Sequence, residues 1–122
     1  MKKILIIEDD IQLRKIYAIK LEEAGYEVAS YATGAEGLEA IKEKLPDLII
    51  LDIMLPGGMN GFDVLEQLKN NPHLRTIPVI ILTNLDSEEH TASTVGSVEY
   101  IVKTNISLDD IVKKVQSYVP IT

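Results

Sequence analysis

Residues 47–52 read Asp47-Leu48-Ile49-Ile50-Leu51-Asp52, a short apolar run that ends on a carboxylate. Three further apolar runs have the same form, because a polar group of a different chemical type follows each of them. They are Ile4–Ile7 before Glu8-Asp9-Asp10, Val79–Leu82 before Thr83, and Val98–Val102 before Lys103. If all four runs are parallel strands, then carboxylates, a hydroxyl and an ammonium meet at one edge of a sheet, beyond the carboxyl ends of the strands.

Segments with helical periodicity separate these runs. Apolar residues recur three and four positions apart in 13–24, 35–45, 62–68 and 108–119. A further helix is expected between Asp86 and Gly96, and it should be short and easily frayed, because 91–95 is rich in β-branched residues of low helix propensity. Strand and helix thus alternate repeatedly, which predicts an α/β fold of the doubly wound, flavodoxin-like type: a three-layer sandwich whose parallel five-stranded sheet is covered on both faces.

The composition of the strands predicts their order. The runs 4–7, 48–51 and 79–82 are continuously apolar, as strands buried on both faces are, whereas 27–30 is short and mixed, which is typical of an edge strand. This pattern favours the order 2-1-3-4-5, in which ligands bind beyond the ends of the first and third strands. The segment 8–9 would then lie beside Asp52.

Length, charge and composition narrow the function classes. A chain of 122 residues suits a single domain, which we expect to span 1–122. It contains no cysteine, which excludes disulfides and thiolate metal sites and fits a cytoplasmic location. The net charge of −7 argues against direct binding to nucleic acid. No run approaches the roughly 18 apolar residues of a membrane span, so we expect no membrane association.

The acidic edge has the composition of a metal site. The three carboxylates at 8–10 cannot all ionise easily in a confined space unless a cation offsets them, and hard oxygen ligands of this kind favour Mg²⁺. Asp52 could complete the site and act as a nucleophile, because an aspartate can form an acyl phosphate. Lys103 would give a phosphoryl oxygen a fixed positive charge, and Thr83 would offer it a hydroxyl donor.

Each of these residues has a simpler explanation when it is taken alone. An aspartate after a strand, such as Asp52, is usually a turn former or a helix cap, and Asp10 is better explained as the N-cap of the first helix than as a ligand. Thr83 alone is more often a capping hydroxyl, and Lys103 alone is more often solvated. Complementary chemistry at all four strand ends favours a shared site over four separate local roles.

Five segments carry a resemblance to a known family. They are Lys3–Asp10, Pro46–Gly57, Asn60–Leu65, Ile77–Thr83 and Tyr100–Lys103. In this order and spacing they resemble the receiver domain of response regulators, the chemotaxis-regulator-like domain of two-component signalling, over nearly the whole chain. The resemblance implies a phosphorelay protein in which Asp52 accepts a phosphoryl group from a histidine kinase or a phosphotransfer protein.

The resemblance also implies roles for the other residues of this edge. The implied Mg²⁺ ligands are Asp9 directly, Glu8 through water, Asp52, and the backbone carbonyl of Met54. Thr83 and Lys103 would hold the phosphoryl oxygens. Tyr100 would change rotamer when Thr83 moves towards the phosphate; the alternative for Tyr100 is a half-buried strand aromatic without a switching role.

The chain departs from the family pattern at several places. Thr104 follows Lys103 where the family usually has a proline, often with a cis bond. A non-proline cis bond costs about 2.5–4 kcal/mol, which makes a trans bond or a rearranged loop the alternative. Gly57-Gly58 adds a residue to the loop after the third strand, Asn84 replaces a small residue, and the segment from Thr83 to Lys103 is short.

Two functions of different classes stay open. The first is a phosphorylation-controlled switch that catalyses its own phosphorylation and dephosphorylation without being a metabolic enzyme. The surface around the fourth helix, the fifth strand and the last helix would then control a protein partner or a missing output domain. The apolar residues Met54 and Leu85 predict that the phosphate is lost slowly. The second is a receiver-like interaction module whose output needs no phosphate, a reading motivated by Thr104 and the short fourth helix.

Other properties are expected from the same reasoning. The unphosphorylated chain should be a monomer, and the sequence fits either a stand-alone receiver or a fragment of a longer protein. A flavin-binding protein of the same fold is disfavoured, because the first strand–helix loop offers carboxylates where a phosphate-binding loop is expected.

Overall fold

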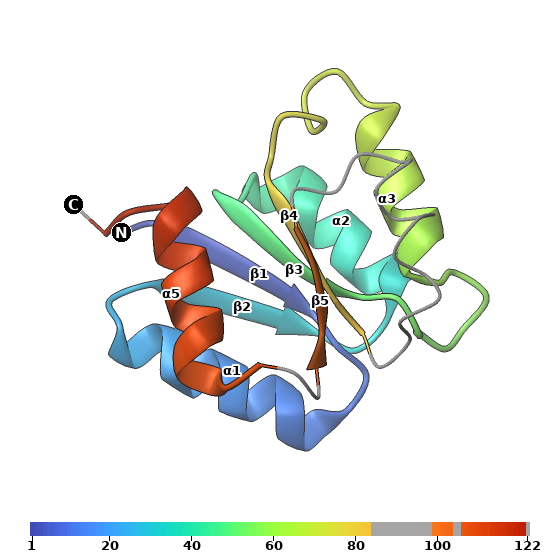
Figure 1. Ribbon diagram of the computed structural model, residues 1–122. Helices are drawn as coiled ribbons and strands as arrows, with labels where there is room; N and C mark the ends of the chain where they lie inside the picture. The colour runs from blue at the N-terminus through green and yellow to red at the C-terminus, as the bar shows by residue number, and fades with distance from the viewer. Residues whose placement is uncertain (84–98, 104–105, 122) are drawn as a thin grey trace.

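The computed structural model describes residues 1–83, 99–103 and 106–121. Five parallel strands form one sheet in the order β2-β1-β3-β4-β5, which confirms the predicted order (Figure 1). The strands are β1 (Lys3–Ile7), β2 (Glu27–Tyr31), β3 (Leu48–Asp52), β4 (Val79–Thr83) and β5 (Glu99–Val102). As predicted, every residue of β3 and β4 is buried, and β2 is a partly exposed edge strand.

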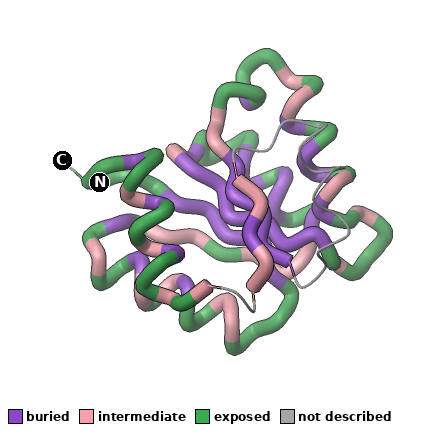
Figure 2. Tube along the Cα trace, in the orientation of Figure 1, coloured by how far each residue is buried: buried purple, intermediate pink, exposed green. Residues whose placement is uncertain are grey.

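Helices cover both faces of this sheet and make it the middle layer of a sandwich. Within the described residues they are α1 (Ile11–Glu23), α2 (Gly34–Lys44), α3 (Gly61–Lys69) and α5 (Leu108–Tyr118). One apolar cluster joins the sheet to α2 and α3, and a second joins it to α1 and α5. The buried strands therefore lie between two cores (Figure 2). The helix expected between 86 and 96 lies outside the described residues.

Helix ends follow local side-chain chemistry. The side chain of Asp10 accepts hydrogen bonds from the backbone N–H groups of Gln12 and Leu13, so it is the predicted N-cap of α1. Ser107 caps α5 in the same way. Gly25 follows the C-cap of α1 with a φ of +107°, a conformation that favours glycine.

Three residues that helical periodicity placed on buried faces, Ile16, Ala35 and Leu45, are exposed, and for Leu45 the backbone gives the reason. Leu45 follows the last residue of α2 and adopts a left-handed conformation with a φ of +49°. Because this conformation takes the residue out of the helical repeat, its side chain leaves the core and is 57% exposed.

The two ends of the described chain lie together near the amino-terminal end of β1 (Figure 1). The buried hydroxyl of Tyr26, just before β2, donates a hydrogen bond to the carbonyl of Val119 at 2.5 Å. This bond ties the end of α5 to the start of β2. Among the described helices, none is long and apolar enough to cross a membrane.

Candidate functional site

The register of the sheet places the predicted polar residues side by side at the carboxyl ends of neighbouring strands. Ile7 pairs with Leu51, Asp52 pairs with Leu82, and Thr83 pairs with Val102. The chain segments that follow β1, β3, β4 and β5 therefore leave the sheet side by side, at the ends to which the strand arrows point in Figure 1. Four separate strand ends thus build one site.

Lys103 lies between two acidic side chains at the centre of this site. Its Nζ donates hydrogen bonds to Glu8 Oε1 at 2.5 Å and to Asp52 Oδ2 at 3.1 Å. The side chains of Lys103, Glu8 and Asp52 are only 10%, 3% and 6% exposed. Charges removed from water to this degree must be paired, and here two neighbouring carboxylates share one ammonium, which offsets only part of their negative charge.

The protonation equilibria of the site reflect this packing. Burial raises the pKa of Glu8, and the nearby Asp52 carboxylate adds to the rise, while the hydrogen bond from Lys103 opposes it. Burial by itself would lower the pKa of Lys103, but the hydrogen bonds and negative charges of Glu8 and Asp52 outweigh it and raise that pKa. The ammonium therefore stays charged at neutral pH.

The side chain and backbone of Asp52 are both held in place. Its Oδ1 accepts a hydrogen bond from the Met54 N–H at 3.1 Å, so the turn-forming role considered for this residue is present alongside its place in the site. Gly61, the first residue of α3, packs directly on the Asp52 backbone: a Cβ at position 61 would lie 2.3 Å from the Asp52 carbonyl oxygen. Only glycine fits this contact without a shift of the backbone.

The loop after β1 depends on a residue that sequence reasoning missed. The Nη1 atom of Arg14, in α1, donates to the backbone carbonyl of Glu8 at 2.9 Å. The Asp10 N–H donates to Glu8 Oε2 at 3.2 Å, so Glu8 is fixed through its carbonyl and its side chain. The available signal was a basic residue one helical turn after the acidic segment 8–10, where its side chain can reach back over the first turn.

The carboxylates of this site fit a divalent cation. Glu8, Asp9 and Asp52 each offer one oxygen, and these three oxygens lie within 4.8 Å of one another. Asp9 is exposed at the mouth of the site, whereas Glu8 and Asp52 are buried. A small set of carboxylate oxygens open to water on one side suits Mg²⁺, which retains several of its waters when bound.

Two further predicted residues belong to the neighbouring strands β4 and β5. Thr83, the last residue of β4, is fully buried. Tyr100 in β5 is half-buried and packs against the core on the α2–α3 side of the sheet. The half-buried position considered for Tyr100 is therefore what the structure has, while a change of rotamer stays a prediction. The Lys103–Thr104 bond, Asn84 and Leu85 fall outside the described residues.

Comparison with known proteins agrees with this geometry. Residues 4–116 match the family model of the response regulator receiver domain. The transcriptional regulatory protein AfsQ1 of Streptomyces coelicolor is 38% identical over 105 residues, which are 84% of this chain and 45% of AfsQ1. The chain thus spans less than half the length of that relative. The polar-differentiation response regulator DivK of Brucella ovis is 34% identical over 119 residues, 96% of this chain and 95% of DivK.

Solved structures show the same likeness. The chemotaxis protein CheY4 of Vibrio cholerae superposes with a TM-score of 0.88 at 27% identity, covering 98% of this chain and 99% of CheY4. The response regulator TrrA of Thermotoga maritima, solved in complex with Mg²⁺ and BeF, gives a TM-score of 0.87 at 29% identity, covering 98% and 100% of the two chains. Receiver domains typically use Mg²⁺ at an acidic pocket of this kind. The family match over residues 4–116, together with the sheet order and the acidic site, shows that this chain belongs to the response regulator receiver domains of two-component signalling.

Proposed function

We propose that Asp52 is the phosphoacceptor of this receiver domain and takes a phosphoryl group from a phosphohistidine of a histidine kinase or a phosphotransfer protein. The observation that carries the proposal is the position of Asp52 at the centre of the site, with one oxygen held by the Met54 N–H and the other by Lys103. Both carboxylate oxygens are thereby oriented before a donor arrives.

The transfer is a substitution at phosphorus. An Asp52 carboxylate oxygen attacks the phosphorus atom, an O–P bond forms, and the N–P bond of the phosphohistidine breaks with its electron pair going to the imidazole nitrogen. Lys103 and the Thr83 hydroxyl then bind oxygens of the transferred group. Little covalent work is asked of the protein, so positioning and charge neutralisation supply most of the catalysis.

The metal ligands are assigned in the same way. Asp9 would bind Mg²⁺ directly, Glu8 through water, and Asp52 and the backbone carbonyl of Met54 would complete the set. When bound, the ion would supply positive charge that offsets the negative charge of the carboxylates and of an incoming phosphoryl group. The closeness of the carboxylate oxygens of Glu8, Asp9 and Asp52 supports this assignment.

Phosphorylation would act as a switch through Lys103. In the unmodified protein its ammonium binds Asp52 Oδ2, and a phosphoryl group on Asp52 offers it a stronger anionic partner. Thr83 would move towards the phosphate and Tyr100 would change rotamer, which biases an existing equilibrium between two conformations. The surface of β5, α5 and the segment 86–96 would carry the change to a downstream protein partner.

The remaining assignments follow from this role. We propose that residues 1–122 act as one cytoplasmic receiver domain that is monomeric when unphosphorylated and binds neither nucleic acid nor membrane directly. Its own chemistry is limited to phosphorylation and slow dephosphorylation of Asp52. The net charge of −7 supports the absence of nucleic-acid binding.

Intact-mass measurement tests the proposal. The wild type, Asp52→Asn and the exposed control Asp109→Asn are incubated with Mg²⁺ and acetyl phosphate. We expect one phosphate-sized mass increase in the wild type and the control, none in Asp52→Asn, and none in any sample with excess EDTA. If Mg²⁺ binds to the wild type and no mass increase follows, the proposal is wrong, and an interaction module that works without phosphate is favoured instead.

A further inference from the structure

A groove on the side of the molecule that carries α2 is separate from the acidic site. It has a volume of about 590 Å³ and lies between the edge strand β2 and the helix α2. Its walls are formed by Tyr31 of β2 and by residues of α2, which are Ala35, Glu36, Glu39, Ala40, Glu43 and Lys44. The proposed phosphotransfer makes no use of these residues.

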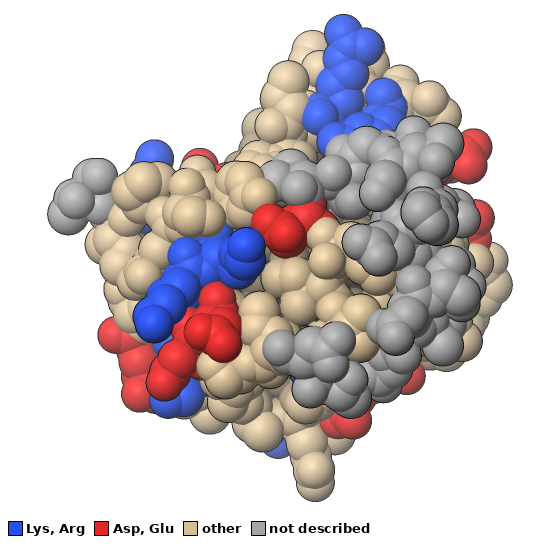
Figure 3. Space-filling model, viewed as in Figure 1, with Lys and Arg blue, Asp and Glu red and all other residues tan. Residues whose placement is uncertain are grey.

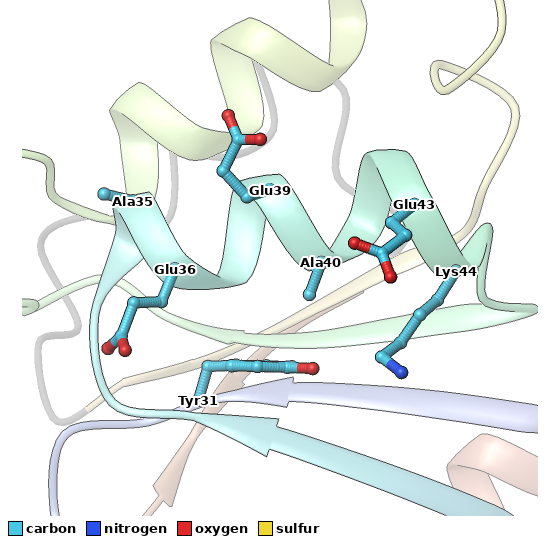
Figure 4. A pocket seen from close by; sticks show the side chains of 7 residues that line it. All are labelled: Tyr31, Ala35, Glu36, Glu39, Ala40, Glu43 and Lys44. Atoms are coloured by element: carbon cyan, nitrogen blue, oxygen red, sulfur yellow. The ribbon is translucent and has the colours of Figure 1, made fainter.

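The lining of this groove is apolar at its floor, and its wall carries carboxylates with the Lys44 ammonium at one end (Figure 4). Tyr31 lies beneath α2 with Ala40 above it, Glu36 extends from α2 towards β2, and Glu43 lies between Ala40 and Lys44. Glu39 points away from β2 and forms an ion pair with Lys42 at 3.8 Å. The groove thus offers the carboxylates of Glu36 and Glu43, with the Lys44 ammonium at one end, around the Tyr31 side chain.

The strand beside this groove has an unused edge. β2 is the first strand of the sheet order and pairs with β1 alone among the described strands. The Glu27 N–H donates to Lys2 and the Tyr31 carbonyl accepts from Glu8, so alternate residues of β2 bond towards β1. In a parallel ladder the residues between them, Val28 and Ser30, direct their backbone N–H and C=O groups outwards.

We propose that this edge and groove bind an extended, basic segment of a partner protein, which adds to the sheet as a strand beside β2. Main-chain bonds to Val28 and Ser30 would supply the pairing, and alternate side chains of the added strand would point into the groove. Glu36 and Glu43 are seven residues apart on α2, about 10 Å along its axis. Alternate residues of a strand are about 7 Å apart, so lysine or arginine at every second position can reach both carboxylates.

Charge argues for a basic partner and against a second copy of this chain. Two β2 strands paired antiparallel about a two-fold axis would bring their two α2 helices, with Glu36 and Glu43, onto the same side of the joint sheet. Like charges would then face one another across the interface. A basic segment instead meets an acidic groove on a chain of net charge −7. On the face shown in Figure 3, by comparison, basic and acidic side chains are mixed over α5.

Binding of a defined peptide tests this proposal. The probe is a fluorescein-labelled octapeptide in which arginine and valine alternate, and its affinity for the full chain is measured by fluorescence anisotropy. The double variant Glu36→Gln with Glu43→Gln should raise the Kd about five-fold, as expected for the loss of two exposed ion pairs. Glutamine at 36 still accepts a hydrogen bond from the Thr33 hydroxyl, so the cap of α2 is kept.

A matched variant separates the groove from net charge. Glu22→Gln with Glu23→Gln on α1 removes the same charge from another exposed surface and should leave the Kd unchanged. An octapeptide of the same composition with its arginines contiguous should bind more weakly, because half of them point away from the groove. An equal loss of affinity in both double variants would overturn the proposal.

Amide hydrogen exchange tests the strand addition itself. The bound peptide should slow exchange at Val28 and Ser30, whose N–H groups face outwards. Binding without this protection, or protection caused by dimerisation of the chain in sedimentation experiments, contradicts the proposal. Because the proposal needs no phosphate, the Asp52→Asn variant should bind the peptide as the wild type does. The result of the peptide-binding experiment is therefore independent of whether Asp52 is the phosphoacceptor.

Discussion

Replacing Lys103 with methionine removes the only cation bonded to the two buried carboxylates in the described structure. Glu8 and Asp52, 3% and 6% exposed, would then face each other without a counter-charge. Removing one partner from a buried ion pair costs about 3–5 kcal/mol. The site opens to water beside the exposed Asp9, so we expect the lower end, about 3 kcal/mol less free energy of unfolding near neutral pH.

The pH dependence of this loss identifies its cause. The pKa of Glu8 is already above its ordinary value of 4.5 because of burial, and without Lys103 it should rise further. A carboxyl group with a raised pKa in the folded state stabilises the fold at low pH, and this stability is lost as the pH rises from the unfolded pKa through the folded one. The difference in free energy of unfolding between Lys103→Met and the wild type should therefore become smaller by about 1–2 kcal/mol when the pH is lowered from about 7 to about 5.

Urea denaturation followed by circular dichroism at both pH values measures this difference. Lys20→Met is the matched control, because Lys20 is 42% exposed and its 4.0 Å ion pair with Asp109 lies at the surface. It should change the free energy of unfolding by less than about 1 kcal/mol at either pH. If Lys103→Met costs no more than this control, or if its cost is the same at both pH values, the paired burial of Glu8 and Asp52 does not have the energetic role described.

Three further outcomes are expected. Arg14→Ala should lower the free energy of unfolding by about 1.5–3 kcal/mol and weaken Mg²⁺ binding measured by calorimetry, because it leaves the Glu8 carbonyl without its charged donor. Arg14→Lys should restore part of the stability and part of the Mg²⁺ affinity. An unchanged Mg²⁺ affinity in Arg14→Ala would contradict a role of Arg14 in holding the loop after β1. Gly61→Ala should lower the free energy of unfolding, measured by urea denaturation, by more than about 2 kcal/mol and by more than Gly37→Ala does. The added Cβ meets the Asp52 backbone at position 61 but the Ile7 side chain at position 37, and a side chain can shift more easily than backbone. The reverse order of the two variants would refute this reading. The phosphorylated protein should keep its phosphate well beyond seconds in the presence of Mg²⁺, because the exposed Met54 side chain cannot align a water for hydrolysis. Loss of the phosphate within seconds, as followed by intact-mass measurement, would show that Met54 does not slow hydrolysis.

Strand chemistry made the sheet and the membership of the site predictable. Buried parallel strands are continuously apolar, so the first polar residue after each one marks where the strand leaves the sheet. Asp52 and Thr83 could be assigned to one edge on that basis, whereas Lys103 follows β5, which contains Glu99 and is only partly buried. The caps at Asp10 and Ser107 were also predictable, since each side chain bonds the first turn of its own helix.

Contacts that depend on side-chain reach or backbone approach could not be predicted. The bridge from Lys103 to both Glu8 and Asp52 depends on the register of four strands and on one lysine rotamer. Arg14 lies one helical turn after the acidic segment 8–10, but its partner is a backbone carbonyl, which the sequence does not identify. Leu45 continued an apolar repeat, and only its left-handed backbone takes it out of the helix.

The bond between Tyr26 and Val119 has a consequence for protein engineering. It fixes the end of α5 beside the start of β2. The two ends of the described chain meet there, at the amino-terminal ends of the strands, whereas the acidic site lies at their carboxyl ends. Neighbouring termini of this kind tolerate domain insertion and circular permutation. The domain could therefore be placed as a cassette within a surface loop of a host protein, provided that Val119 is kept, with its carboxylates facing away from both junctions and open to a donor.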